Sequence, residues 1–305
     1  MPSPKSRARA FRICHLSDLH LPLREEARPY ELANKRALGW LNLKLNRGSA
    51  HRLDVLEGLL SSVGEEGADL HVVTGDLTNL ALDRELADVG ALLARFGLTP
   101  DNTMIVPGNH DRYTIAADLS SAFERGFRAF AEGDLGRTRS YPRTRILGPI
   151  ALAALDTAVW RGPIRAAGRL DAVQADRLAA FLDSPEAADL WPVIAMHHPP
   201  FELTGAILRQ YRVGLAGYEH LSRALAGHEG TIIHGHLHEL SRRAVGGFDA
   251  IGVPSASHDA GDAVAQAAYH VYAFDRAGLL DATVVRFWPD AGGGRRERVP
   301  LPKEA

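Results

Sequence analysis

The chain has 305 residues, of which 46% are hydrophobic and 24% charged, so it can bury a core and is not a disordered tail protein. Its 35 basic and 37 acidic residues give a formal charge of -2, which excludes a general basic surface for nucleic acid or an anionic membrane. The single cysteine, Cys14, excludes a disulfide within the chain and a thiolate metal cluster.

Short apolar runs of strand length alternate with stretches of helical period, which predicts an α/β domain. In chain order, we expect strands at 11–17, 69–74, 103–106, 150–156, 192–196 and 231–234, and helices at 30–45, 52–65, 82–96, 118–132, 171–183 and 219–226. Asp171 and Gln174 mark the start of one helix, since Asp171 can cap its first turn. After residue 238, alternating runs at 240–245, 268–275 and 280–287 predict antiparallel strands.

This pattern predicts one domain over residues 1–290, with a cap-like insertion at 21–51, and a polar C-terminal tail at 291–305. No apolar run approaches the roughly 18 residues that span a bilayer. Polar residues from His15 onward interrupt the apolar start, which argues against a signal peptide. Together with the single cysteine, these features predict a cytoplasmic protein in a reducing compartment.

Side chains of the types that bind metals follow five of the predicted strands, where each strand ends. In open α/β sheets, ligands bind beyond the carboxyl ends of the strands, so we expect these side chains to converge on one site. Imidazole combined with carboxylate and amide oxygen favours manganese, iron or zinc over calcium or magnesium. The clusters are Ser17-Asp18-Leu19-His20, Gly75-Asp76, Gly108-Asn109-His110-Asp111, His197-His198-Pro199-Pro200 and Gly235-His236-Leu237-His238.

Taken in order, these blocks resemble the signature of the calcineurin-like metallophosphoesterase superfamily, and their form is most similar to bacterial cyclic-nucleotide and glycerophosphodiester phosphodiesterases. The resemblance implies a four-layer αββα sandwich of two mixed β-sheets flanked by helices. It also implies a dinuclear centre of two divalent transition-metal ions, either manganese, iron or zinc. By this resemblance one ion is bound by Asp18, His20 and His238, the other by Asn109, His197 and His236, and Asp76 bridges the two.

Each short motif has a simpler explanation when it stands alone, because a Gly-Asp after a strand is usually a turn. A non-catalytic scaffold of the same fold is the alternative from a different class, but every ligand position and the catalytic histidine are retained here. The other histidines are expected to be structural or to lie at the mouth of the site. His71 is expected on a sheet face. His51, His220, His228 and His270 have no ligand-spaced partner, whereas His15, His258 and Asp259 are expected at the mouth.

Hydrolysis of a phosphodiester by a metal-bridging hydroxide is the predicted reaction. Two divalent ions, the carboxylates of Asp18 and Asp76 and a bridging hydroxide leave about one positive charge to attract an anionic phosphoester. The resemblance makes His110 a general acid or hydrogen-bond donor, and Asp111 is expected to hold it protonated. A phosphomonoesterase and a UDP-sugar-lipid pyrophosphatase of the same superfamily remain alternatives.

Substrate recognition is predicted around this centre, with a small phosphoester as the partner and no nucleic acid polymer. His198, Lys35 and Arg36 are the candidate substrate contacts. The insertion at 21–51 leaves directly from His20, so it is expected near the mouth, with Leu38, Leu41 and Leu45 on one helical face. Ordinary packing on its own domain and a membrane-surface role are the alternatives for this segment. The oligomeric state is not predicted.

Overall fold

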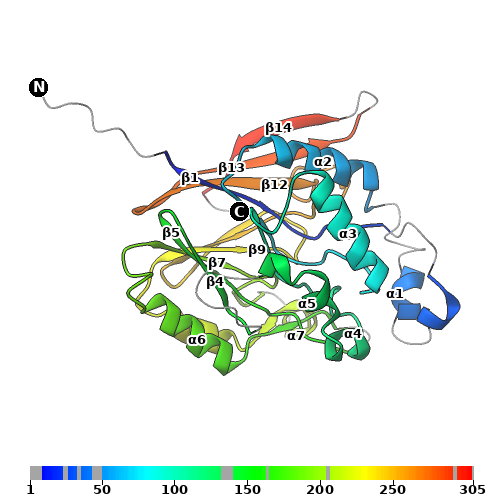
Figure 1. The fold of residues 1–305 in the computed structure, drawn as a ribbon, viewed down its shortest axis with the longest axis horizontal. Helices are drawn as coiled ribbons and strands as arrows, with labels where there is room; N and C mark the ends of the chain where they lie inside the picture. Colours follow the sequence, from blue (N-terminus) through cyan, green and yellow to red (C-terminus); the bar gives the residue numbers. More distant parts are fainter. Residues whose placement is uncertain are drawn as a thin grey trace, which may run out of the picture.

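Two six-stranded mixed β-sheets pack face to face, with helices on their outer faces (Figure 1). The computed structural model describes residues 9–22, 27–32, 36–42, 50–131, 140–162, 165–203, 207–290 and 294–303. The predicted α/β class and four-layer sandwich are therefore confirmed. Within the described residues, no helix has the length and apolar character needed to cross a membrane.

The first sheet joins the N-terminal strands to the C-terminal ones. Its order is β14-β13-β12-β1-β2-β3. β1, β2 and β3 run parallel, so their carboxyl ends meet at one edge, whereas β12, β13 and β14 are antiparallel additions. The strands are β1 (Phe11–Leu16), β2 (Leu70–Val73), β3 (Thr103–Ile105), β12 (Ala268–Asp275), β13 (Gly278–Trp288) and β14 (Arg295–Pro300).

The second sheet comes from the middle of the chain and has the order β10-β11-β9-β7-β5-β4. Its central strands β5, β7, β9 and β11 are parallel. A small two-stranded sheet pairs β6 (Gly168–Arg169) with β8 (Leu215–Ala216). The six strands are β4 (Arg143–Leu147), β5 (Ile150–Ala154), β7 (Trp191–Ala195), β9 (Gly230–His234), β10 (Ser241–Val245) and β11 (Phe248–Gly252).

Three apolar layers hold the sandwich together. α2 (Leu53–Glu65) and α3 (Asp83–Arg95) pack on the first sheet, and α6 (Ala172–Leu182) and α8 (Tyr218–Ala224) pack on the second (Figure 1). Between the sheets, aliphatic side chains of both inner faces, such as Val72 and Ile233, form the central layer. The remaining helices are η1 (Pro29–Leu32), α1 (Arg36–Asn42), α4 (Ile115–Leu119), α5 (Ala122–Gly126), η3 (Ala129–Ala131) and α7 (Ile207–Val213).

The structure corrects three details of the sequence prediction. The helix expected at 118–132 is broken into α4, α5 and η3, because Ser121 has φ 51° and so leaves the right-handed helical region. The polar tail expected from residue 291 contains β14, which pairs with β13. In place of the single helix expected at 30–45, the described residues of the insertion contain two short helices, η1 and α1.

Candidate metal centre and active site

The metal-ligand side chains predicted from the sequence are brought together at the carboxyl ends of strands from both sheets. β1, β2 and β3 lead to Asp18, Asp76 and Asn109, and β7 and β9 lead to His197 and His236. Nitrogen and oxygen atoms of Asp18, Asp76 and His197 lie within 4.8 Å of one another. The face-to-face packing of the two sheets, with these strand ends on the same side, therefore assembles one polar site from five separate motifs.

The backbone at this site is held in an unfavourable conformation. A positive φ is uncommon for residues other than glycine and costs about 1–3 kcal/mol. Among the described residues, seven non-glycine residues have a positive φ, and five of these are candidate metal ligands. The five are Asp18 (53°), His20 (41°), Asp76 (51°), His236 (73°) and His238 (57°). Since such strain persists only where the surroundings enforce it, its concentration here marks this edge as a functional site.

One set of ligand atoms converges beside β1. His238 Nε2 lies 3.1 Å from Asp18 Oδ1 and 3.2 Å from His20 Nε2. His20 Nε2 is also 3.7 Å from Asp76 Oδ2. Two imidazole nitrogens and two carboxylate oxygens thus face a common point, which is a donor set suited to a borderline divalent metal.

A second set converges on the other side of Asp76. His197 Nε2 lies 3.2 Å from Asn109 Oδ1, 3.2 Å from His236 Nδ1 and 3.5 Å from Asp76 Oδ1. Because the two oxygens of Asp76 face different sets, this carboxylate is placed to serve both.

The hydrogen bonds of the histidines leave the second set suited to a bound cation. His197 Nδ1 donates to the carbonyl of Thr74 at 2.7 Å, and His236 Nε2 donates to the carbonyl of Val213 at 2.9 Å. When both imidazoles are neutral, His197 Nε2 and His236 Nδ1 are therefore unprotonated. Two lone pairs and the Asn109 oxygen would face one another 3.2 Å apart. A bound cation removes this repulsion, so the residues present fit a metal ion.

The pKa values of the buried ligand side chains also indicate a site suited to a cation. Burial alone lowers the pKa of His197, but the nearby Asp76 carboxylate outweighs it and raises the pKa to about 9. Burial alone raises the pKa of Asp18, but His238 outweighs it and lowers the pKa to about 2. His236 stays neutral, because burial and then the charge of His197 lower its pKa to about 3. The carboxylates of Asp18 and Asp76 therefore make the site negative, and without a metal ion His197 holds a proton that partly neutralises this charge.

His110 lies beside these atoms without occupying a place in either set. Its backbone N–H donates to Asp76 Oδ1 at 2.7 Å, and its Nδ1 is 2.9 Å from the carbonyl oxygen of Asn79. Because a carbonyl only accepts, Nδ1 carries the hydrogen and Nε2 is left for proton transfer. The ring stacks on Tyr113, with the ring centroids 5.2 Å apart.

Asp111 does not contact the His110 side chain, which it was predicted to hold protonated. The Asn79 carbonyl occupies the position beside His110 Nδ1 where the Asp111 carboxylate was expected. Asp111 instead accepts from the backbone N–H groups of Leu77, Thr78 and Gly108 at 2.9–3.3 Å. Burial, and then the negative charge of Asp76, raise the pKa of Asp111 to about 7. Its side chain therefore joins the two loops that present Asp76 and His110.

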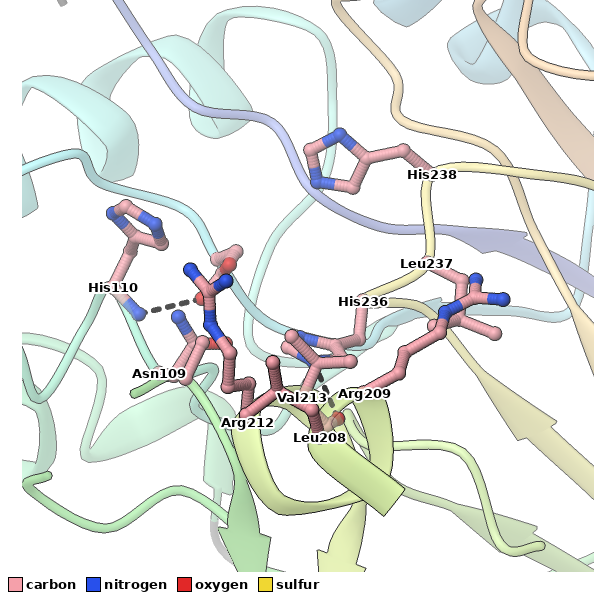
Figure 2. Close-up of a pocket in the computed structure, with 11 residues that line it drawn as sticks. Asn109, His110, Leu208, Arg209, Arg212, Val213, His236, Leu237 and His238 are labelled. Carbon is pink, nitrogen blue, oxygen red and sulfur yellow. Dashed lines mark hydrogen bonds between the residues drawn. The ribbon is translucent and has the colours of Figure 1, made fainter. Parts of the chain in front are cut away.

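A cavity of about 480 Å³ opens over the site, which is enough space for a small ligand. Figure 2 shows the polar side of this cavity, formed by Asn109, His110, His236 and His238, and the opposite side, formed by α7. The α7 side combines apolar and cationic side chains. They are Leu208, Arg209, Arg212 and Val213, and Leu237 continues the apolar surface.

Two of the predicted substrate contacts are corrected, and the third lies outside the described residues. His198 is fully buried, with Nδ1 2.9 Å from Thr157 Oγ1 and Nε2 2.9 Å from the carbonyl oxygen of Ala166. Both nitrogens are occupied, so His198 supports the cavity wall and does not reach into the cavity. Arg36 donates to two carbonyl oxygens of the loop at 80–81, at 2.7 Å each, and lines a different cavity. Lys35 is the residue outside the described part of the chain.

The insertion at 21–51 packs near the site in the part that is described. Trp40 and Leu32 contact a cluster that contains Tyr113, the residue stacked on His110. Leu38 and Leu41, predicted on one apolar face, are 56% and 47% exposed. These contacts give the segment a supporting position behind His110.

Sequence reasoning missed His51, which was interpreted as structural. A nitrogen of His51 lies within 4.8 Å of ligand atoms of His20 and His238, and its Nδ1 is 2.8 Å from Ser257 Oγ. His51 reaches this position through a β-bridge to His258. The two residues are far apart in the chain, so no local motif could have revealed the pair. The arginines of α7 were missed because that helix was not predicted.

The solved structures that resemble this chain show the fold. Purple acid phosphatase PPD1 from yellow lupin (Lupinus luteus) has a TM-score of 0.55 at 12% identity, covering 98% of this chain and 53% of that one. This chain thus spans about half the length of that phosphatase. A protein described as a 5′-nucleotidase from Staphylococcus aureus has a TM-score of 0.48 at 13% identity, covering 97% of this chain and 55% of that one. Vps29 complexed with zinc, from Entamoeba histolytica, has a TM-score of 0.37 at 14% identity, covering 96% and 100%.

At these identities the structural likeness establishes the fold alone, and the two lower scores carry no argument. A comparison with curated proteins finds no match. The sequence model of the calcineurin-like phosphoesterases, however, matches residues 11–240, which is most of the chain. The chain therefore belongs to the calcineurin-like phosphoesterase family, and this membership supports a metal-dependent phosphoester hydrolase.

Proposed function

We propose that this protein is a dinuclear metal-dependent phosphodiesterase that acts on a small substrate. The observation that carries the proposal is the pair of ligand sets on either side of Asp76, with His110 at the edge of the same cavity. Asp18, His20 and His238 would hold one ion, and Asn109, His197 and His236 the other. Manganese, iron and zinc suit these ligands, which mix imidazole with oxygen.

Bound divalent ions would supply Lewis-acid activation of water and neutralise charge on the phosphoryl oxygens. The chain itself supplies orientation and proton transfer. Asp76 is fixed by the His110 backbone N–H, and His197 and His236 are fixed by the carbonyl oxygens of Thr74 and Val213. These hydrogen bonds aim the ligand atoms before any substrate arrives.

His110 is the proposed proton donor to the leaving oxygen. The Asn79 carbonyl fixes the hydrogen on Nδ1, so a second proton on Nε2 can be delivered into the cavity. Stacking on Tyr113 limits rotation of the ring. Asp111 acts as a positioning residue, because its carboxylate joins the loops that carry Asp76 and His110.

The net charge of the proposed centre favours a diester substrate over a monoester. With about one positive charge left at the centre, a singly charged diester is neutralised, whereas a dianionic monoester is not. The open cavity also has apolar side chains, Leu208, Val213 and Leu237, which can contact an organic substituent. Cyclic nucleotides and glycerophosphodiesters are the proposed substrates, and the single buried Cys14 supports a cytoplasmic location.

The test is hydrolysis of bis(4-nitrophenyl) phosphate against 4-nitrophenyl phosphate by protein reconstituted with manganese. We expect faster cleavage of the diester, with cyclic AMP and glycerophosphodiesters tested next. Faster cleavage of the monoester would favour a phosphatase, and cleavage of a UDP-sugar lipid alone would favour a pyrophosphatase. Cleavage of none of these substrates by the metal-loaded protein would leave the scaffold interpretation.

A further inference from the structure

Helix α7 forms the side of the cavity that faces the candidate metal centre. Two of its side chains, Arg209 and Arg212, line the cavity three residues apart, so they lie on the same face of the helix. In Figure 2, Arg212 extends toward Asn109 and His110, whereas Arg209 extends toward Leu237. The helix thus presents one cation near the centre and another farther along the cavity.

The end of α7 is fixed directly to the site. The carbonyl of Val213 accepts from Nε2 of His236, at 2.9 Å. The carbonyl of Arg212 accepts from the backbone N–H of Ala166, at 2.8 Å, and the Ala166 carbonyl in turn lies 2.9 Å from His198 Nε2. The backbone that carries Arg212 is therefore held by residues next to the candidate ligands, and its side chain starts from a fixed position.

The two guanidinium groups retain the capacity to bind an anion. Among the residues that the structure describes, the Arg212 side chain has no hydrogen bond or ion pair. Arg209 is 3.7 Å from Glu239, and both side chains of this pair are about half exposed, so the pair contributes little. Arg165, which stacks on Tyr211 of α7 at 3.9 Å, adds further positive charge beside the helix. Guanidinium groups bind phosphate oxygens in a two-pronged geometry.

We propose that Arg209 binds a second phosphate of the substrate, separate from the phosphoryl group that reacts, while Arg212 faces the reacting group. The inference rests on the proposed function. The reacting group belongs beside Asp76 and His110, where the ligand sets and the proton donor meet, whereas Arg209 lies toward Leu237, away from that point. The substrate class is accordingly a phosphodiester that carries an additional phosphate.

The experiment uses two substrates that differ only in this second phosphate. They are thymidine 5′-(4-nitrophenyl phosphate) and the same ester with a 3′-phosphate, and release of 4-nitrophenol is measured with the manganese-loaded full chain. We expect the wild-type protein to have a kcat/KM about 10- to 100-fold higher for the ester with the 3′-phosphate, as charge-assisted hydrogen bonds would give. Arg209→Ala should reduce this ratio, mainly through KM, and Arg209→Lys should restore part of it, whereas Arg212→Ala should slow both esters alike.

Arg223→Ala is the matched control. Arg223 is an exposed arginine on α8 that pairs with Asp176 and does not line the cavity, so this variant should keep the wild-type ratio. Equal rates for the two esters in the wild-type protein would overturn the inference. Equal losses on both esters in Arg209→Ala would also overturn it and would assign Arg209 to the reacting phosphoryl group. If neither ester nor bis(4-nitrophenyl) phosphate is cleaved, the proposed function itself fails, which is a distinct result.

Discussion

His110→Ala should slow the hydrolysis of diesters with poor leaving groups while leaving the metal content near that of the wild-type protein. The structure places His110 outside both ligand sets but on the cavity wall, with Nδ1 committed to Asn79. Loss of a general acid lowers kcat by roughly 10² to 10⁴, which corresponds to about 3–5 kcal/mol of transition-state stabilisation. A 4-nitrophenolate leaving group needs little protonation, so its slowing should be about tenfold or less.

The cost to folding is smaller and can be estimated separately. The variant loses one hydrogen bond, between Nδ1 and the Asn79 carbonyl, and the stacking on Tyr113. Together these contribute about 2 kcal/mol, which corresponds to a decrease in Tm of roughly 4 °C. A kinetic loss of 10² or more is therefore well beyond what partial unfolding can explain at the assay temperature.

The assay compares kcat for a series of aryl esters of thymidine 5′-phosphate whose phenols have pKa values from about 7 to 10. Metal content is measured by elemental analysis. His228→Ala is the control, because His228 contacts Asp183 and does not line the cavity. Loss of metal from the His110 variant would make His110 a ligand, as its position close to His20 and Asp76 permits. Equal slowing for all leaving groups would refute the proton-donor reasoning.

Three further predictions concern the centre itself. Asp76→Ala should reduce the bound metal from about two ions to less than one in elemental analysis, since one carboxylate serves both sets, and two retained ions would contradict this. Asp111→Asn should lower Tm by roughly 6 °C, because an amide placed against the Gly108 N–H costs about 3 kcal/mol, without moving the pH profile of kcat. A shifted profile with an unchanged Tm would instead assign proton transfer to Asp111. The pKa of His197 is raised from 6.5 to about 9, so its stabilisation of the metal-free protein is complete below pH 6.5 and is lost as the pH rises through 9. Its proton must also leave when a cation binds, so calorimetry in two buffers of different ionisation enthalpy should detect proton release between pH 7 and 8, and its absence would refute the cation-for-proton exchange.

The candidate centre was predictable because its residues stand in short motifs directly after strands. Asp18 and Asp76 follow parallel strands that any right-handed α/β arrangement places side by side. A linear pattern carries this information, since only the edge at which the strands end has to be known. The apolar patterns also predicted the four main helices and most central strands, whereas the division into two sheets came from the family resemblance.

Other features depend on contacts that no local pattern encodes. His51 is brought to His238 by pairing with His258, 207 residues farther along the chain. The role of Asp111 could not be predicted, because a backbone carbonyl, from Asn79, took the place expected for its carboxylate. α7 has only seven residues and no clear apolar period, so neither the helix nor its arginines were predicted.

The C-terminal strand β14 changes how the first sheet meets other protein molecules. β13 has 11 residues, and its stretch from Val284 to Phe287 is largely buried and apolar. Without β14 this long strand would be the edge of the sheet, with unpaired backbone groups open to a strand of another copy. β14 replaces it with a short, arginine-rich edge, in which Arg296 pairs with Glu65 at 2.6 Å and Arg298 pairs with Glu66. The segment predicted to be a polar tail thus covers the edge of β13 with a short strand rich in charged side chains, the kind of edge that disfavours pairing with a strand of another copy.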